Sequence, residues 1–125
     1  MWKNSEVHFA EDYFFKEQAF GTDALVSDAL ELGVTEGGIR VHGWIDGSAS
    51  CASGNSVKVE LEVADEPNAS DWRKIAENTV TADATSMSGD LFSFIPDVEE
   101  HFMRVKVSGA SGVTGTFSIA PELVP

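Results

Sequence analysis

The feature that most constrains the fold is the alternating run SVKVELEVAD, residues 56–65. Charged side chains at Lys58, Glu60 and Glu62 are separated by single apolar residues. The apolar positions are Val57, Val59, Leu61 and Val63. Because successive side chains of a strand point to opposite faces, this pattern predicts a strand with one face in a core and one in water. Such a strand needs a second layer to cover its apolar face.

Five further segments have strand chemistry, and they are residues 28–33, 38–46, 90–97, 101–109 and 115–123. In GIRVHGWID, residues 38–46, the inward positions are Ile39, Val41, Gly43 and Ile45. The opposite positions are Arg40, His42 and Trp44, so Trp44 lies either on the outer face or on a second buried face. The segment DWRKIAENTVTA, residues 71–82, fits either a short helix or an irregular strand.

The connections are rich in Gly, Ser, Asp and Pro, and no long amphipathic helix separates the predicted strands. Strands that recur about every 10 to 15 residues are typical of an antiparallel β-sandwich or barrel. We therefore predict an all-β jelly roll of about seven to eight strands. The chain of 125 residues fits one domain, residues 14–125, preceded by an N-terminal arm, residues 1–13.

The chain is strongly acidic, with 21 Asp and Glu against 8 Lys and Arg and a net charge of −13. Binding to free nucleic acid requires clustered Lys and Arg side chains. The composition therefore argues against nucleic acid and against anionic membranes as partners. The acids are spread along the chain, which indicates a solvated surface. Attraction to a basic protein surface is the alternative interpretation.

The start of the chain lacks the basic region, apolar core and cleavage site of a signal peptide. No apolar run reaches the roughly 18 residues that would indicate a membrane-spanning helix. We therefore expect the protein to stay in the cytoplasm where it is made, or to join an assembly there.

The sequence offers no catalytic or metal-binding constellation, so we expect no enzyme activity, no cofactor and no metal. Cys51 is the single cysteine and is expected to be a loop or strand-edge thiol. The carboxylates of loop 65–71 do not have the spacing of a calcium loop. The glycine-rich run 109–115 precedes a predicted strand, so a hairpin turn is favoured over a phosphate-binding loop. The three histidines are scattered: His8, His42 and His101.

Large aromatic residues are the candidates for partner binding, because aromatic anchors dominate many protein interfaces. Four candidates lie in the N-terminal segment, and the fifth, Trp44, qualifies if it faces outward. The N-terminal four are Trp2, Phe9, Tyr13 and Phe14. The alternative for Phe14, and for Phe15 and Phe20, is that these rings fill the core.

Three segments carry a family resemblance through their order and pattern. They are AFGTDALVSDALELG, VKVELEVADEPNASDWRKIAENTV and LFSFIPDVEEHFMRVKVSGASGVTGTFSIAPEL. In this order the chain resembles, over roughly residues 14–123, the jelly-roll cement (decoration) proteins of tailed bacteriophage capsids, of the kind found in Bordetella phage. Residues 1–13 extend beyond this resemblance.

The resemblance implies a structural function. Such proteins sit on the outer surface of the virion head, are assembled in the host cytoplasm, and have no catalytic residues. They bridge neighbouring major capsid proteins and hold the shell against the pressure of packaged DNA. The resemblance implies the major capsid protein as partner, and a homo-oligomer is expected: a dimer across a two-fold axis is favoured, with a trimer as the other geometry.

Two other function classes compete with this interpretation. A carbohydrate-binding module is the main alternative, since jelly-roll lectins share the architecture and Trp2, Trp44 and Trp72 could stack on sugars. That function needs two coplanar aromatic rings on an exposed face. A small enzyme is disfavoured by the missing metal ligands.

Overall fold

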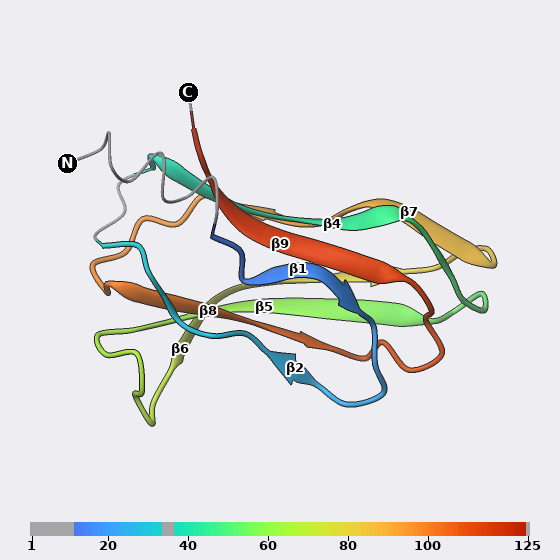
Figure 1. The fold of residues 1–125 in the computed structure, drawn as a ribbon, viewed down its shortest axis with the longest axis horizontal. Helices are drawn as coiled ribbons and strands as arrows, with labels where there is room; N and C mark the ends of the chain where they lie inside the picture. Colours follow the sequence, from blue (N-terminus) through green and yellow to red (C-terminus); the bar gives the residue numbers. More distant parts are fainter. Residues whose placement is uncertain (1–11, 34–36, 125) are drawn as a thin grey trace.

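The structure is a computed structural model of the chain that describes residues 12–33 and 37–124. These residues form nine β-strands and no helix (Figure 1). The strands are β1 (Phe15–Ala19), β2 (Leu25–Val26), β3 (Leu30–Glu31), β4 (Ile39–Ser50), β5 (Ser56–Ala64), β6 (Arg73–Thr81), β7 (Ser86–Phe94), β8 (Phe102–Ser108) and β9 (Thr116–Leu123). The predicted all-β fold is confirmed, and the nine strands exceed the predicted seven to eight; β1 and β2 lie outside the segments for which strands were predicted.

The strands form two antiparallel sheets packed as a sandwich. One sheet has four strands in the order β1-β9-β4-β7, and the other has five, in the order β2-β8-β5-β6 with β3 also paired to β8. Figure 1 shows these sheets as two layers, with β9 and β4 in one and β5 and β8 in the other. No helix among the described residues is long and apolar enough to cross a membrane.

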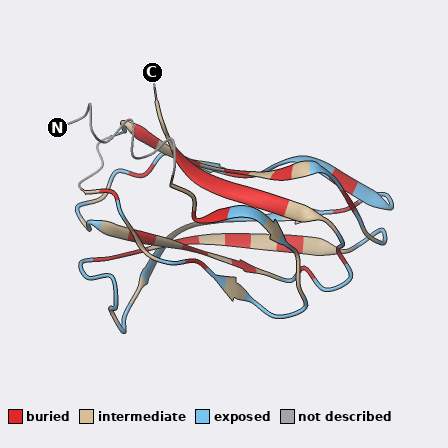
Figure 2. Ribbon diagram, viewed as in Figure 1, coloured by how far each residue is buried: buried red, intermediate tan, exposed pale blue. Residues whose placement is uncertain are grey.

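The core lies between the two layers and follows the alternation of the sequence. Strand β5 buries its four apolar positions at no more than 1% exposure, as predicted. Strand β8 does the same with Met103, Val105 and Val107. In β9, Phe117 and Ile119 are fully buried. Figure 2 shows buried residues recurring along both layers and exposed residues in the connecting loops.

The ambiguous segment 71–82 is a strand and not a helix. Strand β6 pairs with β5 from Ser56↔Thr81 to Val63↔Arg73, with a register shift between Leu61 and Glu62. The helical interpretation depended on local periodicity alone. Pairing with an otherwise open edge of the sheet satisfies the backbone groups of this segment, and this tertiary effect overrides the local pattern.

Two strands are longer than the sequence predicts. Strand β4 continues through the glycine of DGSAS to Ser50, and β7 begins at Ser86, inside a segment that has the composition of a turn. The two extensions pair with each other, with Ser48↔Ser88 and Ser50↔Ser86 in register. Positive φ angles at Gly47 (73°) and Gly89 (89°) accompany the register shifts in this pair. The two strands therefore extend their antiparallel pairing through segments in which the sequence predicted loops.

Candidate functional site

Strand β4 places Arg40, His42 and Trp44 on the outer face of the four-stranded sheet, while the residues between them enter the core. Trp44 therefore lies on an outer face, which decides between the two predicted positions. All three side chains are half-buried. Because β4 lies between β9 and β7, its outer side chains meet residues from both neighbours: Arg40 pairs with Glu122, and Trp44 with Asp90.

A β-bulge brings Asp90 to this face. Strict alternation would place Asp90 in phase with Phe92, which is buried. However, Gly43 pairs with Phe92 and the next residue of β4, Trp44, pairs with Asp90, so Leu91 is an extra residue. Leu91 and Phe92 are both buried, and Asp90 is turned outward. Asp90 was not among the predicted site residues, although the adjacent apolar pair Leu91-Phe92 is a sequence signal of such a bulge.

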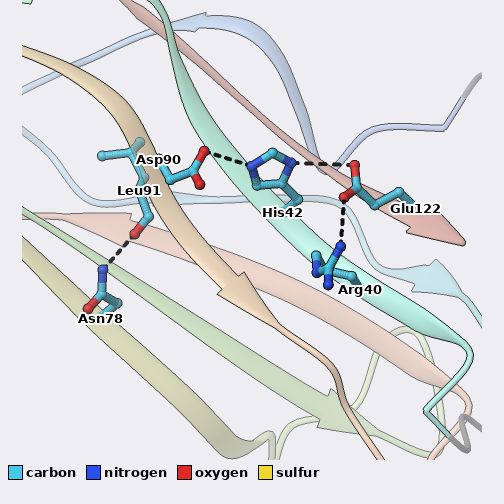
Figure 3. Close-up of polar contacts among 6 residues, drawn as sticks. All are labelled: Arg40, His42, Asn78, Asp90, Leu91 and Glu122. Atoms are coloured by element: carbon cyan, nitrogen blue, oxygen red, sulfur yellow. Dashed lines mark hydrogen bonds and ion pairs between the residues drawn. The ribbon is translucent and has the colours of Figure 1, made fainter. Parts of the chain in front are cut away.

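A chain of polar contacts crosses the face through His42 (Figure 3). Nε2 of His42 lies 2.8 Å from Oδ1 of Asp90, and Nδ1 lies 3.4 Å from Oε2 of Glu122. Oε1 of Glu122 lies 3.7 Å from the Arg40 guanidinium. The imidazole is thus held between two carboxylates whose side chains remain 68% (Asp90) and 42% (Glu122) exposed.

Two aromatic rings complete this site. The ring of Trp44 lies 5.1 Å from the ring of His42 at 44°, and 6.5 Å from the ring of Tyr13 at 63°. The ammonium of Lys16 lies 5.2 Å from the centre of the Tyr13 ring. We call the set Tyr13, Arg40, His42, Trp44, Asp90 and Glu122 the His42 cluster.

The sheet beneath the cluster is closely packed and hydrogen-bonded. A Cβ atom added at Gly43 would lie 3.0 Å from Cγ1 of Ile119, so glycine favours the close packing of β4 against β9. On the outer side, the Ser118 hydroxyl donates to Asp46 at 3.1 Å and accepts the N–H of Glu17 at 2.9 Å. Glu17 has a φ of 48°, at the register shift between β1 and β9. These contacts hold the cluster on a rigid support.

A groove runs beside the cluster, between the edges of the two sheets. It has a volume of about 320 Å³ and is lined by β6 from Ala76 to Asn78 and by β7 from Asp90 to Phe94. Nδ2 of Asn78 donates to the carbonyl of Leu91 at 2.8 Å and so ties the two edges together (Figure 3).

The outer face of the five-stranded sheet carries a different arrangement. The guanidinium of Arg104 lies 4.4 Å from the centre of the Trp72 ring, and its Nε donates to Oε1 of Glu62 at 2.7 Å. We call these three residues the Arg104 set. Nearby, Lys74 contacts Glu77 and also lies 3.5 Å from Glu60.

The loop 65–71 is a connection. It links β5 to β6, and the indole N–H of Trp72 closes it by donating to the carbonyl of Ala69 at 2.9 Å. A hollow of about 510 Å³ near this loop is lined mainly by acidic residues, among them Asp65 and Asp97. Within residues 12–33 and 37–124, no group of three or more His, Cys, Asp or Glu side chains could hold a metal ion.

In that hollow, Arg73 makes two hydrogen bonds to Glu100, at 2.9 and 3.0 Å. The hydrogen bonds from Arg73 hold the pKa of the Glu100 carboxyl below its usual range. On β6, the hydrogen bond from Lys74 likewise lowers the pKa of Glu77. Both carboxylates therefore form ion pairs with a basic side chain of the same chain.

The structure brings together two of the predicted anchors, Tyr13 and Trp44. Phe14 requires a correction: it is 6% exposed, belongs to the core cluster, and donates its N–H to the carbonyl of Ile119 at 2.8 Å. Phe14 therefore fills the core and is not an exposed anchor. Trp2 and Phe9 lie outside the described residues.

No protein-family model matches the sequence, and no curated protein matches it. Several solved structures are similar in fold. The crystal structure of PirA has 14% identity and a TM-score of 0.43, covering 81% of this chain and 82% of PirA. A CBM4 structure has 16% identity and a TM-score of 0.45, covering 83% of this chain and 63% of the CBM4 chain. A structure of infectious bursal disease virus, Gx strain, has 13% identity and a TM-score of 0.41, covering 88% of this chain and 29% of the viral chain.

At these identities the likeness concerns the fold alone, which is an antiparallel β-sandwich. The chain spans less than two thirds of the CBM4 and viral chains. Function therefore has to be argued from the residues of this chain.

Proposed function

We propose that the protein is a structural, non-catalytic component of a bacteriophage head, a cement protein that binds the outside of the shell and bridges neighbouring major capsid proteins. The observation that carries the proposal is the His42 cluster, in which Tyr13, Trp44 and Arg40 share one accessible face. Tyr, Trp and Arg are the residue types most enriched among the energetically dominant residues of protein interfaces.

The rigidity of the support favours a cement function. A module that orders itself on binding loses part of its affinity to the entropy of ordering. Here three residues of the cluster, Arg40, His42 and Trp44, lie on the central strand β4, whose inner side chains Ile39 and Val41 are fully buried. The hydrogen bonds of Ser118 and the close packing at Gly43 hold the outer side in place. A preformed face of this kind favours tight binding to a shell.

The ring geometry favours this function over sugar binding. A sugar platform needs two coplanar aromatic rings, whereas Tyr13 and Trp44 meet edge to face at 63°. The faces of these rings therefore do not form one flat surface. The charged neighbours Asp90 and Glu122 suit contacts with a protein partner.

The proposal includes a location and an assembly. The protein is expected on the outer surface of the virion, joined to heads in the host cytoplasm. Self-association across a two-fold axis is favoured, and a trimer at a three-fold axis is the other geometry.

Cosedimentation with expanded, DNA-free heads that lack this protein tests the proposal. The heads would come from the phage whose genome carries the gene. We expect saturable binding at a fixed ratio to the major capsid protein, together with a raised melting temperature of the shell, because a ligand that binds only the assembled state stabilises it. The same titration with unassembled capsid protein is the control and should show much weaker binding.

Absence of binding to heads at low and moderate salt would remove the cement function. Quenching of tryptophan fluorescence by sugars, lost in Trp44→Ala, would then favour the carbohydrate-binding alternative. The two outcomes are separable because sugar binding needs no assembled shell.

A further inference from the structure

We propose that the His42 cluster is an arginine-binding site, in which a guanidinium group from the capsid partner stacks on the Trp44 ring and pairs with Asp90 and Glu122. This inference rests on the proposed function for the identity of the partner. The chemistry of the site, however, is argued from this chain and is tested separately below.

The Arg104 set of the same protein shows how a tryptophan and a carboxylate bind an arginine side chain. In the Arg104 set, a tryptophan ring and a carboxylate hold one arginine between them, at 4.4 Å from the ring centre of Trp72 and 2.7 Å from Glu62. Arg104 and Glu62 are opposite each other on β8 and β5. The set combines a cation–π contact with a charge-assisted hydrogen bond, and all of its partners come from the same chain.

The His42 cluster also combines a tryptophan ring with carboxylates, but its own arginine, Arg40, lies beside Glu122 at 3.7 Å. Trp44 and Asp90 are opposite each other on β4 and β7. Two cation–π contacts occur among the described residues, Lys16 over Tyr13 and Arg104 over Trp72. In this part of the chain no cation lies over the Trp44 ring. Oδ1 of Asp90 contacts His42, and Oδ2 has no hydrogen-bond partner within the described part of the chain. The site therefore combines a half-buried ring, which has no cation over it, with one carboxylate oxygen of Asp90 that is available to an additional cation.

The distribution of charge favours a cationic partner. The bases on the strands of the five-stranded sheet are Lys58, Arg73, Lys74, Arg104 and Lys106. On the strands of the four-stranded sheet the described bases are Lys16 and Arg40. The same strands carry four acids, Glu17, Asp46, Asp90 and Glu122, so acids outnumber bases on the four-stranded sheet. This excess of negative charge favours a positively charged group of a partner.

Arginine fits this site better than lysine. Its planar guanidinium stacks on an aromatic face and can donate to a carboxylate through two N–H groups at once. The Asp90 side chain is 68% exposed, which leaves its oxygens accessible for such a fork. His42 holds Asp90 and Glu122 on its two sides and so acts as a positioning residue.

The first experiment locates the site without phage heads. The ¹⁵N-labelled protein is titrated with hexa-arginine, and amide and indole shifts are followed by NMR, with hexa-lysine as the comparison. We expect saturable shifts around Trp44 on β4, β7 and β9, a several-fold weaker effect of hexa-lysine, and loss of these shifts in Trp44→Ala. Shifts confined to the acidic loops 65–71 and 95–101, or an unchanged response of Trp44→Ala, would overturn the inference.

The second experiment measures binding to heads with matched variants. Trp44→Ala is expected to weaken binding about tenfold or more. Asp90→Asn combined with Glu122→Gln is expected to weaken it several-fold and to flatten its salt dependence. Trp72→Ala removes the corresponding ring of the other sheet and should leave affinity within about twofold. Circular dichroism establishes that each variant is folded.

The outcomes distinguish the two proposals. If heads bind the wild-type protein and Trp44→Ala equally well, the arginine site is wrong and the cement function stands. If heads do not bind but hexa-arginine shifts Trp44, the cement function is wrong and the cation site stands.

Discussion

The two outer faces of the sandwich use similar residues for different ends. On the five-stranded sheet, Trp72, Arg104 and Glu62 form a complete set of ring, cation and acid. On the four-stranded sheet, Trp44 and Asp90 lie opposite each other on β4 and β7, and no described cation lies over the Trp44 ring. The first face is thus satisfied by residues of its own chain, and we propose that a partner supplies the cation for the second.

The acidic side chains of the two faces also differ in burial. The Glu62 side chain is 15% exposed, so loss of its partner would leave a carboxylate largely removed from water. The Asp90 side chain is 68% exposed and is hydrated without its contacts. Stability should therefore depend on the Arg104 set, and binding on the His42 cluster.

The largest expected effect is that of Leu61→Asp, which tests the register on which both faces depend. Leu61 is fully buried on β5, one position from Glu62 of the Arg104 set. The substitution places an unpaired charge in the core and is expected to cost more than about 4 kcal/mol, enough to unfold the protein. Urea denaturation followed by circular dichroism measures it.

The matched control is at the neighbouring position, Glu60. From the sequence we expect Glu60→Lys to be nearly silent, but the structure places Glu60 near Lys58 and Lys74, so a third lysine adds repulsion. Glu60→Gln is the cleaner control, with an expected cost of at most about 1 kcal/mol. If Glu60→Gln unfolded the protein and Leu61→Asp did not, the assignment of inner and outer faces would be inverted.

The next largest effect is that of Gly43→Ala, on the inner side of the His42 cluster. A Cβ atom there would lie 3.0 Å from Cγ1 of Ile119, so the Ile119 side chain must move by a few tenths of an ångström in a packed core. We expect a loss of about 1–3 kcal/mol, the usual range for overpacking a core. Thermal unfolding measures the loss, and Gly21→Ala, at a position with open space, is the control. Equal melting temperatures for Gly43→Ala and wild type would show that the packing here is looser than described.

The direct test of the comparison sets Arg104→Ala against Asp90→Asn. Arg104→Ala removes the partner of Glu62 and the cation over Trp72, and we expect a loss of about 1–2 kcal/mol. Asp90→Asn changes an exposed carboxylate and is expected to stay within about 0.5 kcal/mol of wild type. Chemical denaturation of both variants provides the values. A larger loss for Asp90→Asn would mean that the His42 cluster serves stability, contrary to our interpretation.

Much of the fold could be predicted from the sequence because alternation is a local signal. The inward positions of Leu61, Val105 and Phe117 were predicted from alternation and are confirmed. The outward position of His42 was predicted in the same way, from the alternation within β4 alone. The partners of His42 could not be predicted. Asp90 reaches the outer face only through the bulge at Leu91, and Glu122 only through the pairing of β9 with β4. Register depends on pairing between distant strands, which no local pattern records, and the adjacent apolar pair Leu91-Phe92 indicates a bulge without showing what it faces.

The smallest expected effect concerns Glu100→Gln, at an exposed ion pair on the edge of the five-stranded sheet. The hydrogen bonds from Arg73 lower the pKa of Glu100 in the folded protein. A carboxyl whose pKa is lowered on folding stabilises the native state above its unfolded pKa of about 4.3, and this contribution is lost as the pH falls through the lowered value. We expect a slight loss of stability in the variant at pH 7, and melting curves that converge with wild type as the pH falls toward 3. A difference in melting temperature between the variant and the wild type that grew toward low pH would contradict a stabilising ion pair between Glu100 and Arg73.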